Sequence, residues 1–311
     1  MSSQKEYADQ IKAEALRLGF SACGIAPAEP ITPEAEKHFR EWLSTGHHGD
    51  MAYMANNVEK RCDPRLLVEG TRSIVSVALN YYPQEQLADD QYQFAWYAYG
   101  KDYHDIMRAK MNTLFAYIDE HITPVNGRVF CDTAPVLDRY WAWRAGLGWI
   151  GKNTQLIIPF AGSSFFLGEL FLDIDLAYDI PQRNRCGNCT RCQQACPTQA
   201  FEAPYKLNAN KCISYLTIEN RGDIPSQYAS KLGNRIYGCD ECQRVCPWTN
   251  CATPCSTPEL QPTPEFMRMT KNDWHALTEE QYRILFKGSA VKRAKYSGLQ
   301  RNIDAAESFD K

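Results

Sequence analysis

Eight of the chain's 13 cysteines lie between Cys186 and Cys246, and this crowding constrains the fold more than any other feature. The segment around them is rich in proline, asparagine and arginine and has few long apolar runs. Such a segment cannot build a sufficient hydrophobic core, so it needs an inorganic one. The chain has 311 residues and no recognisable secretory signal, which favours metal ligation over disulfide bonds.

Two cysteine runs have the spacing of bacterial ferredoxins. The first reads C-x2-C-x2-C-x3-C-P from Cys186 to Pro197. The second reads C-x2-C-x3-C-P from Cys239 to Pro247 and lacks one cysteine of the full run, which the isolated Cys212 can supply. The count therefore closes at eight, the number that two [4Fe–4S] clusters require.

In ferredoxins the last cysteine of a run binds the opposite cluster, so we predict two crossed sets of four ligands. The first set is Cys186, Cys189, Cys192 and Cys246, and the second set is Cys196, Cys212, Cys239 and Cys242. Zinc in all-cysteine sites is the alternative, but such sites rarely use successive two-residue gaps followed by Cys-Pro. The remaining cysteines read as spare thiols (Cys251, Cys255) or as buried free cysteines (Cys23, Cys62, Cys131).

Composition excludes some classes of protein. The formal net charge of −3 argues against a chain that binds nucleic acid over its whole surface. No run of about 18 apolar residues occurs, so no transmembrane helix is predicted. Residues 1–20 read as an amphipathic helix, with neither the apolar core of a signal peptide nor a twin-arginine pair, and we therefore expect a cytoplasmic protein.

The chain divides into three predicted parts. Residues 1–182 read as an α/β (α+β) domain, residues 183–258 as a ferredoxin-like domain with two clusters, and residues 259–311 as a short, basic, helical tail. The first part is predicted to contain strands at residues 20–26, 73–81, 128–132, 155–159 and 164–174, the last two adjacent across a turn. Its helices are expected up to Gly19 and at residues 32–43, 103–121 and 136–147.

One loop of the first part carries a candidate catalytic residue. Asp132 follows a predicted strand, and loops at strand ends in α/β folds face ligand crevices. It could instead cap the following helix, a role that Thr133 could also fill. Further on, the glycine-rich stretch 146–151 leads to Lys152 and Asn153 and could approach a large planar or phosphate-bearing ligand closely. No P-loop and no GxGxxG motif is present.

Several motifs in combination resemble epoxyqueuosine reductases. They are DTAPVLDR at residues 132–139, GWIGKN at 148–153, the first cysteine run, CISYLTIE at 212–219 and GCDECQRVCPWT at 238–249. The resemblance covers nearly the whole chain. It implies a cobalamin in the N-terminal domain beside the nearer cluster, and epoxyqueuosine at the wobble position of a tRNA as substrate. We also expect an external low-potential electron donor, a monomer, and a short form without the C-terminal helical-repeat domain of longer family members.

By this resemblance, Asp132 matches the family's proton donor. The residues that match the family's cobalamin site, or fall in segments lining it, are Arg61, Asp132, Arg139, Lys152, Asn153, Leu156 and Ser214. The cobalamin motif DxHxxG is absent, because Met107 stands where its glycine would be. His104, the histidine of the nearest match, is therefore not expected to bind cobalt from below, and we place it at the start of its helix.

The implied reaction removes the epoxide oxygen and leaves an alkene, which takes two electrons and two protons. The clusters would pass electrons singly to cobalt, and the corrin would carry the difficult chemistry. A carboxyl group buried above a corrin would have its pKa raised by desolvation. We therefore expect Asp132 to be a neutral acid that protonates the opening epoxide.

Two other functions stay open at this level. A reductive dehalogenase also combines cobalamin with two clusters, but such enzymes are typically exported with a twin-arginine signal. A plain ferredoxin-type electron carrier would need no substrate, and its cobalamin content would distinguish it from an enzyme.

The predicted tail carries a local basic run. Residues 287–302 hold five positive charges and no acid, although the chain as a whole is slightly acidic. A solvated helix face is the plainer interpretation, but phosphate contacts from such residues would supply salt-dependent affinity for tRNA. The predicted tRNA contacts are Arg221, Lys292, Arg293, Lys295 and Arg301. Arg221 lies near Cys212, close to where the family engages the anticodon loop.

Overall fold

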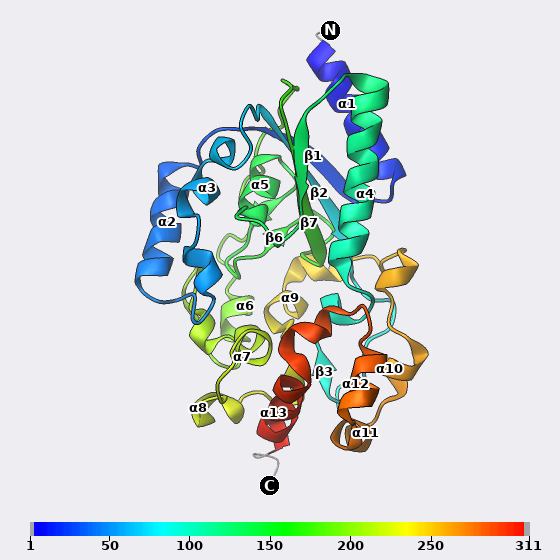
Figure 1. Ribbon diagram of the computed structural model, residues 1–311. Helices are drawn as coiled ribbons and strands as arrows, with labels where there is room; N and C mark the ends of the chain where they lie inside the picture. Colours follow the sequence, from blue (N-terminus) through cyan, green and yellow to red (C-terminus); the bar gives the residue numbers. More distant parts are fainter. Residues whose placement is uncertain (1–2, 308–311) are drawn as a thin grey trace.

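The computed structural model describes residues 3–307 (Figure 1). Residues 1–2, and residues 308–311 of the predicted tail, lie outside the described residues. The main sheet and the helices that cover it form the upper half of the view, and the cysteine-rich segment and the tail form the lower half. The N-terminus is at the top and the C-terminus at the bottom.

A four-stranded antiparallel sheet organises the first part of the chain. Its strands, in spatial order, are β1 (Ala22–Pro27), β2 (Ser73–Asn80), β7 (Phe165–Leu172) and β4 (Gly127–Phe130). The two central strands, β2 and β7, are almost entirely buried, which explains their continuous apolar sequence. Because every ladder in this sheet is antiparallel, the predicted fold class is confirmed in its α+β form.

The two faces of the sheet belong to different cores. Val75, Val77 and Leu79 of β2 pack with α1 (Ser3–Arg17) and α4 (Tyr103–Tyr117). The intervening Ile74 and Ala78 pack instead with α5 (Asp138–Arg144) and α2 (Pro33–Ser44). This alternation follows from the two-residue period of a strand. Figure 1 shows α1 and α4 side by side on one face of the sheet.

Helix α4 lies unusually close to the sheet. A Cβ atom added at Gly168 of β7 would lie 2.5 Å from the sulfur of Met111, so the absence of a side chain there lets the helix approach. The contacts of α4 with β7 and β4 bring its first turn to the end of β4. Asp132 follows that strand end, which is why residues of α4 reach it.

The cysteine-rich segment is made of short elements. They are α6 (Arg191–Gln194), β8 (Phe201–Ala203), β9 (Lys206–Leu207), α7 (Ile213–Ile218), α8 (Ser226–Ala229), β10 (Arg235–Tyr237) and α9 (Glu241–Arg244). Helices α6 and α9 each carry one cysteine, Cys192 of the first run and Cys242 of the second, and the two helices contact each other. The two runs are therefore neighbours in space, as a double-cluster fold requires.

The tail packs into the main body of the protein. Its helices are α10 (Pro264–Arg268), α11 (Lys271–Ala276), α12 (Glu279–Leu285) and α13 (Lys295–Glu307). Threonine caps start the first three of these helices. The rings of Phe266, Trp274 and Phe286 surround Phe94 of β3 (Gln93–Phe94). Asn302 of α13 is fully buried and donates to the carbonyls of Thr217 and Ile236, both at 2.8 Å.

Some details differ from the prediction. The strands expected at residues 155–159 and 164–174 belong to different sheets, because β6 (Leu156–Ile157) pairs with β5 (Trp149–Ile150) rather than with β7. The helix expected at residues 103–121 ends at Tyr117 and continues as a π-helical turn, Ile118–Ile122. Helix α5 is shorter than predicted and is followed by Gly146 at φ +80°.

Contacts cross both predicted domain boundaries. The parallel pair β3–β10 joins residues 93–94 to residues 235–237, and the aromatic cluster joins the tail to β3. The division at residues 182 and 258 therefore remains a prediction about segment roles.

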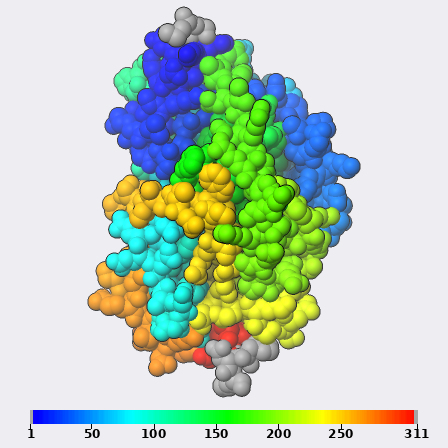
Figure 2. All heavy atoms as spheres, turned by 180° about the vertical axis from the view of Figure 1, so that it is seen from behind, coloured from blue at the N-terminus to red at the C-terminus, as the bar shows by residue number. Residues whose placement is uncertain are grey.

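Seen from behind, the chain around residues 150–200, in green, lies at the surface along the middle of the molecule (Figure 2). None of the helices within residues 3–307 has both the length and the apolar character that crossing a membrane demands.

Candidate active site and cluster-binding segment

Asp132 sits at the centre of a hydrogen-bonded group of side chains. It follows β4 in the left-handed backbone region, with φ 57°. Its Oδ2 atom accepts a hydrogen bond from the hydroxyl of Tyr103 at 2.9 Å and lies 3.3 Å from Nε2 of His104. The Asp132 side chain is 63% exposed. It does not cap α5, since no side-chain hydrogen bond caps that helix at Leu137.

A second carboxylate holds the other nitrogen of the histidine. Nδ1 of His104 lies 2.6 Å from Oδ1 of Asp102, the N-cap residue of α4. These hydrogen bonds, first to Asp102 and then to Asp132, raise the pKa of His104 to about 9. Because both nitrogens face carboxylates, His104 is protonated at neutral pH. It stands at the start of its helix, as expected, and has no nitrogen left for cobalt.

The charge of Asp132 differs from the expectation. The hydrogen bond to His104 is the largest influence and lowers the pKa of Asp132, while partial burial opposes it. The sequence argument expected a raised pKa because it considered desolvation alone. It missed the histidine, which is 28 residues away along the chain and is brought close by the approach of α4 to the sheet.

The surroundings of Asp132 form a recess. Arg139 at the start of α5 is exposed, yet surrounding protein lowers its pKa by desolvation. A group that is both exposed and desolvated faces a hollow rather than a convex surface. Cys131 and Thr133, on either side of Asp132, line a separate cavity of about 320 Å³, which neither Asp132 nor Arg139 lines. The recess at Asp132 therefore offers charged side chains to a polar ligand.

Two buried carboxyl groups lie behind this recess. Glu169, in the middle of β7, is 0% exposed, and burial raises its pKa well above the ordinary value. Asp138 in α5 faces it, and burial raises the pKa of Asp138 to about 6. Burial therefore favours the neutral form of Glu169. The sequence reasoning missed this pair, although a glutamate inside the apolar run FFLGELFL was a visible signal.

Mutual effects on cysteine pKa values follow the two predicted sets, with one effect between the sets, of Cys192 on Cys242. Cys186, Cys189 and Cys246 of the first set all lie close enough to Cys192 to contribute to raising its pKa, after the larger effect of burial. In the second set, the pKa of Cys242 is raised first by burial and then by Cys239 and Cys212, and Cys196 adds to the raised pKa of Cys212. The isolated Cys212 therefore lies with the set that the count assigned to it.

Hydrogen-bond donors surround these sulfurs. The amide of Ala200 donates to Sγ of Cys196 at 3.3 Å, and the amides of Ser214 and Tyr215 lower the pKa of Cys212, against the larger effect of burial. The indole Nε1 of Trp149 is buried without a partner among the described residues and packs with Cys246. Backbone and indole N–H groups of this kind stabilise sulfur ligands of iron. The segment therefore fits iron–sulfur clusters.

Most residues predicted to line a cobalamin are tied into the fold. Lys152 donates to the carbonyls of Gly187 and Cys189, at 2.6 and 2.9 Å. Asn153 is buried and donates to the carbonyl of Cys242 at 3.1 Å. Both side chains therefore join the first part of the chain to the cysteine loops.

The other three predicted cobalamin contacts lie on different elements. Arg61 of α3 (Val58–Cys62) is buried and donates to the carbonyls of Tyr53 and Asn56. Leu156 is buried in β6, and Ser214 is half-buried in the first turn of α7.

The predicted tRNA contacts fall into two groups. Lys292, Lys295 and Arg221 are exposed, and so is Arg293, which pairs with Glu219 at 2.7 Å and helps to lower the pKa of Asp132. The basic run of the tail, residues 287–302, thus lies near the recess at Arg293. Arg301 is different, because its guanidinium donates to three carbonyls, those of Leu216, Asn220 and Gly222.

Comparison with known proteins identifies the family. An epoxyqueuosine reductase from Cellulophaga algicola is 47% identical over 98% of this chain and 99% of its own length. The chain belongs to the epoxyqueuosine reductase family. The Escherichia coli member is 38% identical over 97% of this chain and 80% of its length. A family model described as epoxyqueuosine reductase QueG, DUF1730, matches residues 61–133, and one described as a 4Fe-4S double cluster binding domain matches residues 185–249.

Solved structures of epoxyqueuosine reductases have the same fold. One contains an epoxyqueuosine-modified tRNA-Tyr stem loop and superposes with a TM-score of 0.90 at 30% identity, over 98% of this chain and 81% of the other. Another, from Bacillus subtilis, has an aspartate catalytic loop swung out of the active site (TM-score 0.88, 29% identity, 98% and 82% coverage). A reductive dehalogenase shares the fold only, at 18% identity and a TM-score of 0.51 over 97% of this chain and 38% of the other.

These similarities confirm several predictions. The chain is an oxidoreductase of the epoxyqueuosine reductase family, and residues 185–249 form a double [4Fe–4S] domain. Identities of 38–49% to epoxyqueuosine reductases do not favour the dehalogenase or the plain electron carrier. The zinc alternative is likewise not supported.

Proposed function

We propose that this enzyme reduces epoxyqueuosine at the wobble position of a tRNA to queuosine, with Asp132 as the residue that delivers a proton. The observation that carries the proposal is the recess: Asp132 is hydrogen-bonded to two proton-bearing side chains, in a chain of this family. Epoxyqueuosine opening creates an alkoxide, and a proton held within hydrogen-bond reach neutralises it.

The recess has side chains suited to a cobalamin, since Asp132 and Arg139 are both exposed and charged and protein surrounds Arg139. The residues proposed to hold it are Arg61, Asp132, Arg139, Lys152, Asn153, Leu156 and Ser214. When bound, the cobalamin would supply a strongly reducing cobalt centre and the clusters would supply its electrons singly. The proposed ligands are Cys186, Cys189, Cys192 and Cys246 for one cluster, and Cys196, Cys212, Cys239 and Cys242 for the other.

The proton route follows from the protonation states. Asp132 carries the negative charge of the group at neutral pH, and the adjacent proton resides on Nε2 of His104. As negative charge grows on the epoxide oxygen, the proton can move from Nε2 to Oδ2 of Asp132 and from that carboxyl group to the oxygen. Tyr103 holds the carboxyl group in place through its 2.9 Å hydrogen bond. Asp102 keeps the imidazole oriented and protonated.

Other parts of the proposal concern the partners. Lys292, Arg293 and Lys295 would contact tRNA phosphates beside the recess, with the wobble base splayed into it.

A tRNA substrate supports a cytoplasmic location for the enzyme. One chain assembles both cysteine sets and Asp132, which supports action as a monomer. Residues 1–182 would hold the cobalamin, residues 183–258 the clusters, and residues 259–311 a tRNA contact.

The test is anaerobic purification and reconstitution, followed by counting iron, sulfide and cobalt and assaying epoxyqueuosine-containing tRNA. We expect eight irons and one cobalamin per chain and formation of queuosine only when both cofactors are loaded. Clusters without cobalamin binding would point to an electron carrier. Binding of both cofactors without turnover of the tRNA, but with reductive removal of halide from an aryl bromide, would point to a dehalogenase.

A further inference from the structure

Three arginines form a rim around the first cysteine run. Arg183, Arg185 and Arg191, which we call the arginine rim, are all exposed. Within residues 3–307, none of their guanidinium groups forms an ion pair or a hydrogen bond. The chain around them crosses the middle of the surface seen in Figure 2. The rim therefore presents three unneutralised positive charges to solvent.

No acid balances the rim locally. Residues 180–201 contain no aspartate or glutamate, although the whole chain has a net charge of −3. The acids at either end of this stretch are engaged elsewhere. Asp179 pairs with Lys12 at 2.7 Å, and Glu202 pairs with Lys211 at 3.3 Å. A positively charged patch on an otherwise acidic protein attracts an acidic partner and orients it.

The rim is connected to the first cysteine set. The guanidinium carbon of Arg185 lies 5.9 Å from the centre of the Trp149 ring, a cation–π contact. Trp149 packs in turn with Cys246 and Cys186. Cys186, Cys189 and Cys192 are only partly buried. A molecule that covers the rim would therefore lie directly over the first cluster.

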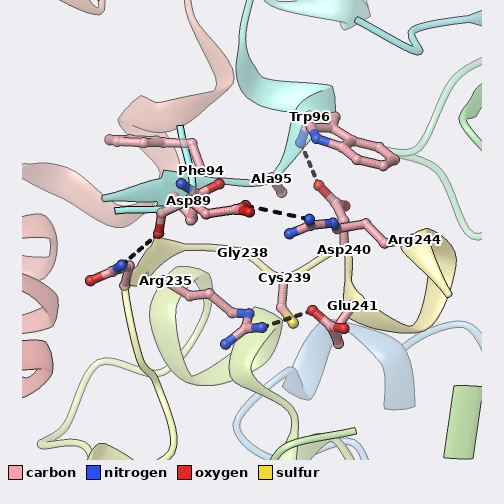
Figure 3. Close-up of a pocket in the computed structure, with 12 residues that line it drawn as sticks. Asp89, Phe94, Ala95, Trp96, Arg235, Gly238, Cys239, Asp240, Glu241 and Arg244 are labelled. Atoms are coloured by element: carbon pink, nitrogen blue, oxygen red, sulfur yellow. Dashed lines mark hydrogen bonds and ion pairs between the residues drawn. The ribbon is translucent and has the colours of Figure 1, made fainter. Parts of the chain in front are cut away.

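A pocket beside the second set is a weaker candidate for electron access. It has a volume of about 180 Å³ and is lined by Cys239 (Figure 3). Its arginines are neutralised, because Arg235 pairs with Glu241 at 2.8 Å and Arg244 with Asp89 at 3.5 Å. With both arginines paired and Asp240 also in its lining, the pocket offers no free positive charge to an acidic partner.

The tRNA is also a less suitable occupant of the rim. The basic run of the tail lies near the recess, as the influence of Arg293 on Asp132 shows. In Figure 1 the tail stands in the foreground, whereas the chain around the rim covers the back in Figure 2. A bound anticodon loop at the recess leaves the rim free for a second partner.

The geometry points to the arginine rim as the docking site of a small acidic, low-potential redox protein, such as a flavodoxin-type carrier. In each encounter the carrier loses one electron and the first cluster gains it, so one turnover takes two encounters. This inference rests on the proposed function, because it names the external donor of the same reaction.

The experiment compares three reconstituted proteins. One is the parent, one has Arg183→Glu, Arg185→Glu and Arg191→Glu, and one is a charge-matched control with Lys37→Glu, Arg268→Glu and Arg283→Glu, on α2, α10 and α12. A rim variant with glutamine at the same three positions guards against damage by charge reversal. The probe is an acidic flavodoxin. Its affinity is measured by calorimetry in the oxidised form, and cluster reduction is followed by absorbance with the reduced form.

We expect the rim variant to bind flavodoxin at least about tenfold more weakly at low salt, to accept electrons correspondingly slowly, and to approach the parent at high salt. Reduction by methyl viologen radical should not slow. Equal flavodoxin affinities in parent and rim variant overturn the inference, as does a rim variant that loses tRNA affinity but not flavodoxin affinity. Iron content is measured first, so a failure to load clusters, which contradicts the proposed function, is distinguished from a failure of docking.

Discussion

At the residue scale, Asp132 combines a proposed catalytic role with a negative charge. The Asp132→Asn variant keeps the shape and the hydrogen bond from Tyr103 but cannot deliver a proton. We expect iron, cobalt and tRNA affinity to be retained and turnover to fall roughly 10²-fold or more. The matched control is Asp105→Asn in the first turn of α4, an 85% exposed carboxylate, which should leave turnover unchanged. Near-parental turnover of the Asp132 variant would show that another group supplies the proton.

The protonation of His104 predicts an alkaline limit. Its pKa of about 9 lies above the ordinary value near 6.5, so the folded protein holds this proton more tightly than the unfolded chain. The resulting stabilisation is complete below about pH 6.5 and is lost as the pH rises through about 9. Turnover should fall over the same upper range with loss of one proton. A His104→Gln variant cannot carry this proton, so its turnover should not show the alkaline fall. A pH profile identical to that of the parent would exclude His104 from the proton route.

The isolated Cys212 provides a test of the ligand count. Changing Cys212 to Ser should damage one cluster and largely spare the other, because Cys212 groups with Cys196, Cys239 and Cys242. Iron and sulfide analysis measures the loss. Cys251→Ser is the control, since Cys251 is exposed and lies outside both groups. Full iron content in the Cys212 variant would remove it from the ligand set.

The sequence was more informative about the proposed cluster ligands than about the protonation of the candidate catalytic residue. Cysteine spacing is a local property, so both sets could be predicted before any contact was known. The protonation of Asp132 depends on His104 and on the close approach of α4 at Gly168, which are tertiary facts. The same limit applies to Lys152, whose bonds to two cysteine-loop carbonyls no motif could reveal.

At the scale of elements, long strands were predictable and short ones were not. The continuous apolar run of β2 gave its position to within a residue of the observed bounds. The two- and three-residue strands β3 and β10 have no periodicity that could identify them. Yet this parallel pair joins the first part of the chain to the cysteine-rich segment, and sequence reasoning placed a boundary between them.

The basic run of the tail predicts a salt-dependent contribution to tRNA affinity. Neutralising Lys292, Arg293 and Lys295 together should weaken tRNA binding and flatten its dependence on salt, because fewer counterions are released. Cluster and cobalamin content should not change. The measurement is tRNA affinity of variant and parent across a salt series. Identical affinities and slopes would mean that this surface is only solvated.

Arg301 has a structural role that separates it from these residues. Its guanidinium donates to the carbonyl of Leu216 at the end of α7 and to those of Asn220 and Gly222 in the loop that follows. Arg301→Gln would leave some of these carbonyls unpaired and should lower the free energy of unfolding by about 1–3 kcal/mol. Denaturant unfolding measures this change. Parental stability together with weakened tRNA binding would instead return Arg301 to the tRNA contacts.

At the scale of the whole molecule, the proposed reaction needs two approaches to one chain. The tRNA would reach the recess beside the basic run of the tail, and the electron donor would reach the arginine rim, next to the first cysteine set. Lys152 and Asn153 tie the catalytic part to loops of both sets. Separate surfaces let both macromolecules stay bound while electrons pass.

The buried Asn302 also bears on how the chain matures. Its amide bridges α7, which follows Cys212, and β10, which precedes Cys239. These bonds can form only after residue 302 has been synthesised. All eight cysteines leave the ribosome earlier. The hydrogen bonds of Asn302 therefore join the segments on either side of the second cysteine set only after both sets have been synthesised.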